Sequence, residues 1–95
     1  MLRLGGQALD LMLACAEGRL GDMAVNWAED HAMCVVMAAQ GYPGSYEKGS
    51  VIRGLEEMPE TSHEMCFHAG TTRRDGQYLA NGGRVLGLTA RGENL

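Results

Sequence analysis

Glycine is the residue that most restricts the fold of this 95-residue chain. It supplies 14 positions, about twice the usual share, and it clusters at 41, 44 and 49 and again at 82 and 83. Because the chain has only two prolines and no Gly-X-Y period, these glycines indicate turns and loops rather than a low-complexity chain. Only short elements fit between the clusters, and the length predicts a single domain over residues 1–95.

Ahead of the glycine clusters, the first twenty residues carry a helical pattern. Apolar residues recur at three- and four-residue spacing and form one wide face, which we expect to be buried. The two stripes of this face are Leu4, Ala8, Leu11 and Cys15, and Leu9, Met12, Leu13, Ala16 and Leu20. Gly18 is suited to end the helix, because glycine accepts the left-handed backbone that follows many helices.

The remaining segments predict strands. Residues 23–27 alternate apolar and small or polar side chains, as a half-buried strand does. Residues 32–39 form an apolar run that favours a strand buried on both faces, with a short helix as the alternative. We expect these two segments to pair as a hairpin, a loop to follow over residues 41–49, and a short strand to form at 51–52.

Later in the chain, residues 65–71, 77–80 and 84–90 are also expected to be strands. Asp75-Gly76 is a strong signal for a hairpin turn between the first two of them, and residues 81–83 indicate a second turn. The pattern as a whole predicts an α+β fold, with a mainly antiparallel sheet of half-barrel or meander form and an N-terminal amphipathic helix.

Charge and cysteine content exclude several classes of protein. The net charge of −4 and the lack of a basic stripe argue against a dedicated nucleic-acid binder. There is no apolar run of about 18 residues that would suggest a membrane span. Cys15, Cys34 and Cys66 are odd in number and stand in apolar surroundings, so we expect buried free thiols in a reducing compartment.

A histidine and cysteine motif is the first candidate for chemistry. His63, Cys66 and His68 are spaced H-x2-C-x-H, but no fourth ligand for zinc stands nearby. A nucleophilic Cys/His pair would also need an orienting group that the sequence does not suggest. We therefore predict neither a metal site nor a catalytic residue in this chain, and expect His68 to hydrogen-bond within the sheet.

The second candidate is a pair of basic residues beside glycines. Arg84 follows Gly82 and Gly83 and opens a strand, where its planar guanidinium could hold two oxygens of a phosphate; a solvated surface arginine is the alternative. The GYPGSYEKG loop lacks the Lys-Ser/Thr that a phosphate-binding loop carries after its last glycine. By itself, that loop predicts a turn shaped by Gly41, Pro43 and Gly44.

Four ordered motifs point to a family. The strings VVMAAQGYPGSYEKGSVIRGL, CFHAGT, DGQ and NGGRVLGLTARG resemble the C-terminal domain of the phosphoribosylamine–glycine ligases, also called glycinamide ribonucleotide synthetases. The resemblance covers residues 2–92. These enzymes are ATP-grasp ligases of purine biosynthesis, which use ATP to join glycine to 5-phosphoribosylamine through a glycyl phosphate.

The resemblance implies a truncated C-terminal domain. The family's R-F-G-D-P-E stretch, which holds magnesium and nucleotide, is expected before Met1, and a final helix after Leu95. ATP and magnesium or manganese are then cofactors of the full-length enzyme, with none in these 95 residues, which we expect to be inactive alone. The implied partners are the ATP-grasp lobes of the same enzyme and 5-phosphoribosylamine, with no nucleic acid or membrane, and the implied location is the cytoplasm.

The resemblance also implies roles for particular residues. The loop residues Gly41, Tyr42, Pro43 and Gly44 and the turn residues Gly82 and Gly83 are expected to face the substrate cleft, with Arg84 and Lys48 binding the substrate phosphate. Bare apolar surface on the helix or the last strand suggests a homodimer of the truncated chain. The alternative function is a freestanding small-ligand or protein-interaction module without catalysis, which an open reading frame lacking an upstream ATP-grasp region would favour.

Overall fold

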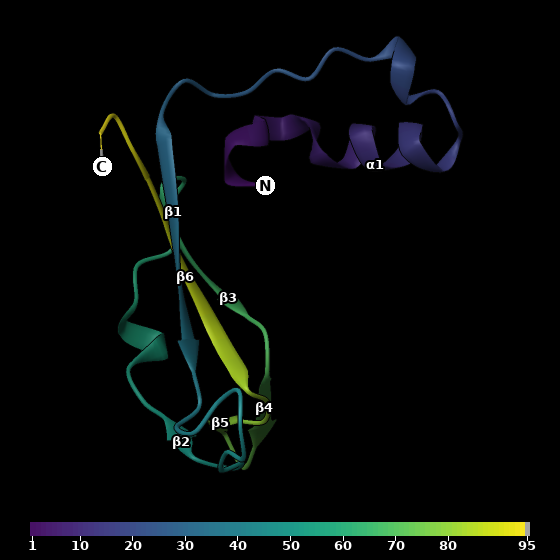
Figure 1. Cartoon of the computed structure of the whole chain (residues 1–95). Helices are drawn as coiled ribbons and strands as arrows, with labels where there is room; N and C mark the ends of the chain where they lie inside the picture. The colour runs from purple at the N-terminus through teal and green to yellow at the C-terminus, as the bar shows by residue number, and fades with distance from the viewer. Residues whose placement is uncertain (95) are drawn as a thin grey trace. The chain divides into compact units, whose positions relative to one another are not determined.

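The computed structural model describes residues 1–94 and divides them into two compact units. One consists of Met1–Ala32 with the residues from Arg91 onward, and the other of Met33–Ala90. The helical elements are η1 (Leu2–Gln7), α1 (Ala8–Ala16), η2 (Leu20–Asp22) and η3 (Leu55–Glu57). The strands are β1 (His31–Ala38), β2 (Val51–Ile52), β3 (Glu64–His68), β4 (Thr71–Arg74), β5 (Gln77–Ala80) and β6 (Arg84–Gly92) (Figure 1).

The first helix is shorter than its sequence pattern. Gly5 leaves the helical region with φ 59° and ψ −134°, so a 3₁₀ turn precedes α1. At the other end, Gly18 has φ +71°, and the N–H groups of Gly18 and Arg19 donate to the carbonyls of Cys15 and Ala14 at 3.3 and 2.9 Å. These two bonds make the Schellman motif, which confirms that the helix ends at Gly18.

The apolar face of α1 is not buried, contrary to the expectation. Ala14 is its one buried residue, whereas Leu9 is 75% exposed and Met12 57% exposed. The periodic pattern therefore identifies the helix correctly but does not identify what covers its face.

Residues 23–27 do not form the expected strand. The segment is extended, but its backbone groups bond to the side chain of Gln7, which donates to the Ala24 carbonyl at 3.2 Å and accepts from the Asn26 N–H at 2.8 Å. The hairpin predicted with residues 32–39 was therefore wrong, and β1 pairs with β6 instead.

A bidentate ion pair closes the unit that contains α1. The Arg91 guanidinium donates to both carboxylate oxygens of Asp30, at 2.7 and 2.9 Å, and each side chain is only about one-fifth exposed. This hydrogen bond, together with the charge of Arg91, lowers the pKa of Asp30 below its ordinary value of 3.8. Fork-shaped pairs of this kind are stronger than single-contact surface pairs.

We expect the Asp30–Arg91 pair to stabilise its unit only above acidic pH. A lowered pKa in the folded state means that the stabilisation is present above 3.8 and is lost as the pH falls through the folded-state value. Arg91→Met should therefore destabilise the chain at pH 7, with the difference from wild type vanishing in strong acid. Urea unfolding followed by Trp27 fluorescence measures this.

Arg19→Met is the matched control, because Arg19 pairs with Glu17 in the open, where the two side chains are 44% and 49% exposed. Exposed pairs contribute little, so this variant should unfold like wild type at every pH. An equal loss in both variants would contradict the assignment.

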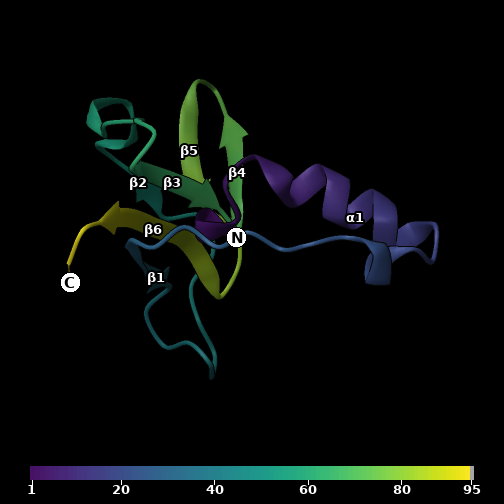
Figure 2. The same cartoon turned by 90° about the horizontal axis from the view of Figure 1, so that it is seen from above.

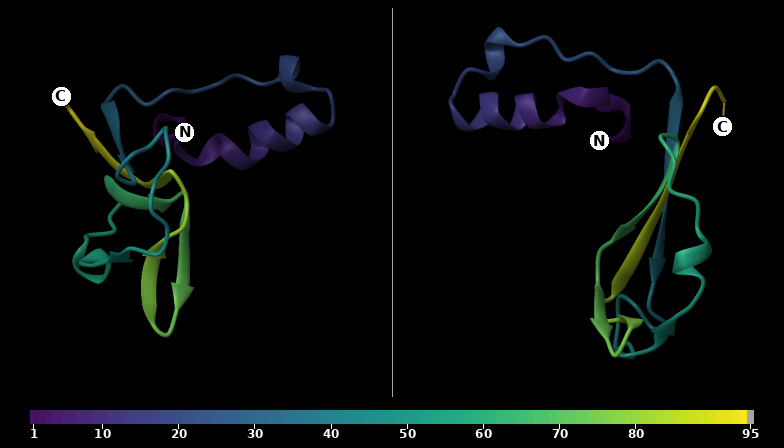
Figure 3. Two further views of the ribbon diagram at one scale, coloured as in Figure 1. Left: turned by 60° about the horizontal axis from the view of Figure 1, so that its bottom comes forward. Right: turned by 180° about the vertical axis from the view of Figure 1, so that it is seen from behind.

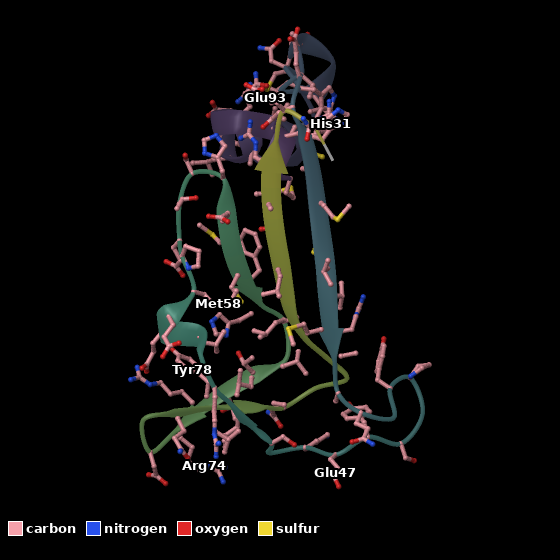
Figure 4. All side chains as sticks on the ribbon, turned by 90° about the vertical axis from the view of Figure 1, so that its left-hand side faces the viewer. His31, Glu47, Met58, Arg74, Tyr78 and Glu93 are labelled. Carbon is pink, nitrogen blue, oxygen red and sulfur yellow. The ribbon has the colours of Figure 1, made fainter. Side chains whose placement is uncertain are left out.

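The second unit contains two three-stranded sheets, in the orders β1-β6-β3 and β2-β5-β4. Strand β3 pairs antiparallel with β6, with Cys66 opposite Leu88, and Figure 4 shows β6 between its two neighbours, with the arrowheads of β1 and β6 at opposite ends. Strand β5 pairs antiparallel with β2 and β4. The α+β class with an N-terminal helix and antiparallel sheets is confirmed.

Local turn chemistry explains the β4–β5 hairpin. Asp75 and Gly76 both have positive φ, 52° and 78°, as a two-residue type I′ turn requires, and Arg74 pairs with Gln77 across it. The hairpin crosses the direction of β6 instead of extending it (Figure 2). The predicted turn at Asp75-Gly76 is confirmed.

The predicted strand over residues 65–71 is divided into β3 and β4. The N–H groups of Ala69 and Gly70 both donate to the Val85 carbonyl, at 3.0 and 3.1 Å. Two residues facing one is the arrangement of a β-bulge, which bends a strand. The chain therefore changes sheets at this point, which period-two alternation does not reveal.

The core of this unit is small. Ala80, Val85 and Leu86 are buried, and they pack against partly buried residues of the surrounding elements, namely Ala39, Ile52, Leu55 and Cys66. Leu55 belongs to η3, on the segment that joins β2 to β3 (Figure 3). The expectation that residues 32–39 are buried on both faces was wrong, since β1 is an edge strand and Met33, Val35 and Val36 are each more than half exposed.

Candidate functional site

Half of the sequence-predicted site residues gather around one pocket of the second unit. The pocket has a volume of about 510 Å³ and includes Tyr42, Gly82, Gly83 and Arg84. Its other lining residues are Val36, Ala69, Gly70, Asn81, Leu86 and Gly87. We call it the glycine pocket, because four of its ten lining residues are glycines.

Backbone hydrogen bonds bring the loop after β1 to this pocket. The Ala39 N–H donates to the Gly83 carbonyl at 2.8 Å, and the Tyr42 N–H donates to the Ala39 carbonyl at 3.1 Å. The Tyr42 ring then lies directly over Gly83, where a Cβ would stand only 2.1 Å from the ring Cδ2. The Tyr42 ring can therefore occupy this position only because residue 83 has no side chain.

The floor of the pocket is backbone. A Cβ on Gly70 would lie 2.5 Å from the Arg84 carbonyl and 2.9 Å from the Cα of Gly82, and the Asn81 N–H donates to the Gly70 carbonyl at 2.8 Å. Within residues 1–94, the N–H groups of Gly82 and Gly83 donate to no other residue. Successive free backbone N–H groups form a concavity that binds anions.

Arg84 supplies the positive charge of the pocket. It is the first residue of β6, directly after the two glycines, and its side chain is exposed. No carboxylate of the described chain forms a salt bridge with it. A guanidinium beside two donor N–H groups is chemically suited to an oxyanion such as a phosphate.

Lys48 does not join this arrangement. It is exposed, it is not among the residues that line the glycine pocket, and its ammonium lies 5.9 Å from the ring centroid of Tyr46. Gly41, Pro43 and Gly44 likewise do not line the pocket. The tight turn at Gly41, which has φ +96°, instead sets the position of Tyr42.

Sequence reasoning missed Gly70 and Asn81 as members of the site. Asn81 adjoins the recognised double glycine, so its position was available from the motif. Gly70 offered no comparable signal. It belongs to the site because its backbone lies against Gly82, and the two glycines are on different connections, β3–β4 and β5–β6.

The histidine and cysteine motif does not form a centre. His63 shares a hydrogen bond with Ser62 at 2.9 Å, and His68 with Thr71 at 2.7 Å. Thr71 belongs to β4 of the other sheet, so His68 bonds between the sheets and not, as was expected, within its own. Across residues 1–94, no three His, Cys, Asp or Glu side chains are grouped to hold a metal ion. Figure 4 labels Met58 and Tyr78, which lie with Cys66 and His68 around a separate pocket of about 150 Å³.

The cysteines are free, but two of them are not buried as expected. Cys15 and Cys34 are exposed, and Cys66 is partly buried. Cys34 lies on the edge strand β1, with its sulfur over Gly87, so an apolar run of sequence did not imply burial. Burial, followed by the charge of Glu60, raises the pKa of the Cys66 thiol above its ordinary value.

We therefore expect the three thiols to react at different rates. Cys15 and Cys34 should be labelled readily by iodoacetamide in the native chain, and Cys66 more slowly, because the thiolate is the reactive species and burial raises the pKa of the Cys66 thiol. Mass spectrometry of a labelling time course measures the three rates. Cys66 should match the others in urea, and equal native rates would contradict the expectation.

None of the helices in the part of the chain that is described is long and apolar enough to span a bilayer.

Comparison with known proteins shows a consistent similarity. The family model described as "Phosphoribosylglycinamide synthetase, C domain" matches residues 32–95. The phosphoribosylamine–glycine ligase of Arabidopsis thaliana, named as chloroplastic, is 47% identical over 97 residues, which cover all of this chain and 18% of the relative. The ligase of Brucella melitensis is also 47% identical, covering 95% of this chain and 21% of the relative.

A solved structure shows the same similarity. The crystal structure of the phosphoribosylamine–glycine ligase of Thermotoga maritima superposes with a TM-score of 0.65 at 36% identity, covering 88% of this chain and 20% of that protein. This chain therefore spans about a fifth of the length of these three relatives.

Proposed function

Because the chain belongs to the family of phosphoribosylglycinamide synthetase C domains, we propose that residues 1–95 act as the C-terminal domain of a phosphoribosylamine–glycine ligase. In that reaction ATP phosphorylates the glycine carboxylate and leaves as ADP. The amine of 5-phosphoribosylamine then attacks the glycyl carbonyl, and phosphate departs. The part we assign to this chain is binding of the substrate's 5-phosphate in the glycine pocket.

The observation that carries this assignment is that Arg84, an exposed arginine, lines a pocket together with Gly70, Gly82 and Gly83. Its guanidinium would pair with two phosphate oxygens, and the N–H groups of Gly82 and Gly83 would donate to the third. Such charge-assisted bonds are stronger than bonds between neutral groups. They fix the reacting amine in place without taking part in the bond changes.

The chain's own residues do not fit the metal that the family implies. Magnesium takes carboxylate and other oxygen ligands, and residues 1–94 contain no suitable cluster of acidic side chains. ATP and magnesium are therefore assigned to the rest of the longer enzyme, and no chemical step is assigned to residues 1–95.

Exposed apolar surface supports the proposed partners. Leu9 and Met12 of α1 and Met33 and Val35 of β1 are each more than half exposed, and large exposed apolar patches usually mark interfaces. We assign these surfaces to the ATP-grasp lobes of the same enzyme. The homodimer of the isolated chain stays a prediction, as does the cytoplasmic location, since one relative is named as chloroplastic.

A domain exchange tests the proposed function. The 95-residue chain alone, given ATP, magnesium, glycine and phosphoribosylamine, should release no ADP above a protein-free blank. Substituted for the stretch of the Brucella ligase that it matches over 90 residues at 47% identity, it should restore glycine-dependent ADP release. A folded chimera that binds ATP but shows no turnover would contradict the proposal.

A further inference from the structure

Tyr42 is the one aromatic side chain of the glycine pocket, and a phosphate site has no need of it. Two neighbours fix its ring. One edge lies over Gly83, and the ring of Tyr46 meets it edge-on, with centroids 6.2 Å apart and an interplanar angle of 64°. Tyr42 nevertheless remains 41% exposed, so part of the ring is free to contact a ligand in the pocket.

The pocket has room for a ligand larger than a simple anion. Its volume of about 510 Å³ falls within the range of about 300–1,000 Å³ that is typical of sites for small organic molecules. Arg84 and the two glycine N–H groups account for only one end of such a ligand. Val36 and Leu86 add apolar surface to the lining. Apolar surface favours contact with the hydrocarbon part of a ligand over contact with a charged group.

We infer that Tyr42 is a positioning residue of this pocket, which selects a pentose 5-phosphate over inorganic phosphate by packing its ring against the carbon face of the sugar. The inference rests on the proposed phosphate site at Arg84. Aromatic rings present a large, rigid apolar face, and this one is fixed by its neighbours before any ligand binds. A preformed wall lowers the entropy cost of ordering the ligand.

Binding of two ligands to the 95-residue chain separates the phosphate contact from the sugar contact. Ribose 5-phosphate and inorganic phosphate are titrated against wild type and variants, and the amide resonances of Gly82 and Gly83 are followed by NMR. Tyr42→Ala should weaken ribose 5-phosphate binding roughly 3- to 10-fold and leave phosphate binding unchanged. Tyr42→Phe, which keeps the ring, should bind both ligands as wild type does.

Gly83→Ala provides a second variant that leaves Tyr42 in the chain. The new Cβ would stand 2.1 Å from the tyrosine ring, so the ring must leave its present position over residue 83. The loss of ribose 5-phosphate affinity should be at least as large as that of Tyr42→Ala. Trp27→Ala is the control for loss of an exposed aromatic side chain, because Trp27 is 58% exposed and does not line the pocket, and this variant should bind both ligands as wild type does.

Arg84→Ala distinguishes failure of the inference from failure of the proposed site. Suppose that Arg84→Ala weakens the binding of both ligands, and that Tyr42→Ala changes neither affinity or lowers both equally. The phosphate site then stands, and the role of Tyr42 is refuted. If wild type binds neither ligand, or Arg84→Ala changes neither affinity, the phosphate site itself is refuted and the inference falls with it.

Discussion

Replacing Arg84 by alanine in a ligase that carries this domain should raise the KM for phosphoribosylamine about ten- to a hundredfold. A hydrogen bond to a charged group is worth about 1.5–3 kcal/mol, and the exposed guanidinium at the start of β6 is the charged group of the pocket. The KM for ATP should stay within about twofold, because the nucleotide is assigned to other parts of the enzyme. Steady-state kinetics with each substrate varied in turn measures both constants.

Two further basic residues serve as comparisons. Arg74 lies at the tip of the β4–β5 hairpin (Figure 4) and is exposed, so Arg74→Ala should leave both constants unchanged. Lys48→Ala should have a smaller effect than Arg84→Ala, since Lys48 lies outside the pocket lining. An unchanged phosphoribosylamine KM in the Arg84 variant would refute the assignment, and an equal rise in the Arg74 variant would show a general effect of positive charge.

The parts of the fold that sequence predicts well are those fixed by local chemistry. Asp75 and Gly76 adopt the positive φ that their two-residue turn requires, and Gly18 ends a helix through bonds to residues only a few positions earlier. Strand β6 also follows from its own apolar residues. Each of these elements is determined within about ten residues, which is the range over which propensity and turn type act.

The elements predicted wrongly depend on distant contacts. Residues 23–27 have the alternation of a strand, but the side chain of Gln7 takes their hydrogen bonds. Cys34 stands in an apolar run, yet it is exposed because β1 lies at the edge of its sheet. A run of apolar residues shows how much free energy their burial would contribute. It does not show whether another element of the fold lies against them.

In the candidate site, too, some features follow from adjacent residues and others depend on distant contacts. Arg84 was recognisable because a double glycine precedes a strand, a pattern of adjacent residues. The position of Tyr42 over Gly83 was not, since it depends on the pairing of Ala39 with Gly83 across the unit. Motif and resemblance together therefore identify the loop and the turn, and the fold supplies the contact between them.

Gly41→Ala should be the most destabilising glycine substitution in the loop after β1. The residue has φ +96°, and a Cβ there would lie 2.2 Å from the carbonyl oxygen of Ser45. A left-handed conformation costs an alanine about 1–2 kcal/mol, and the clash adds about 1–3 kcal/mol because a backbone atom cannot swing away. Hydrogen exchange of the buried Val85 and Leu86 amides measures the stability of this unit.

Gly49→Ala separates the two contributions to that loss. Gly49 ends the same loop with φ +90°, but nothing lies within 4 Å of a Cβ at this position, so alanine there should lose only the conformational part, about 1–2 kcal/mol. The difference between the variants then reports the contact with Ser45. Because that turn positions Tyr42, Gly41→Ala should also weaken ribose 5-phosphate binding at temperatures where the unit is still folded, whereas Gly49→Ala should not. Equal losses of stability in the two variants would mean that the turn at Gly41 relaxes freely, and that Tyr42 is not held over Gly83 by the geometry of its loop.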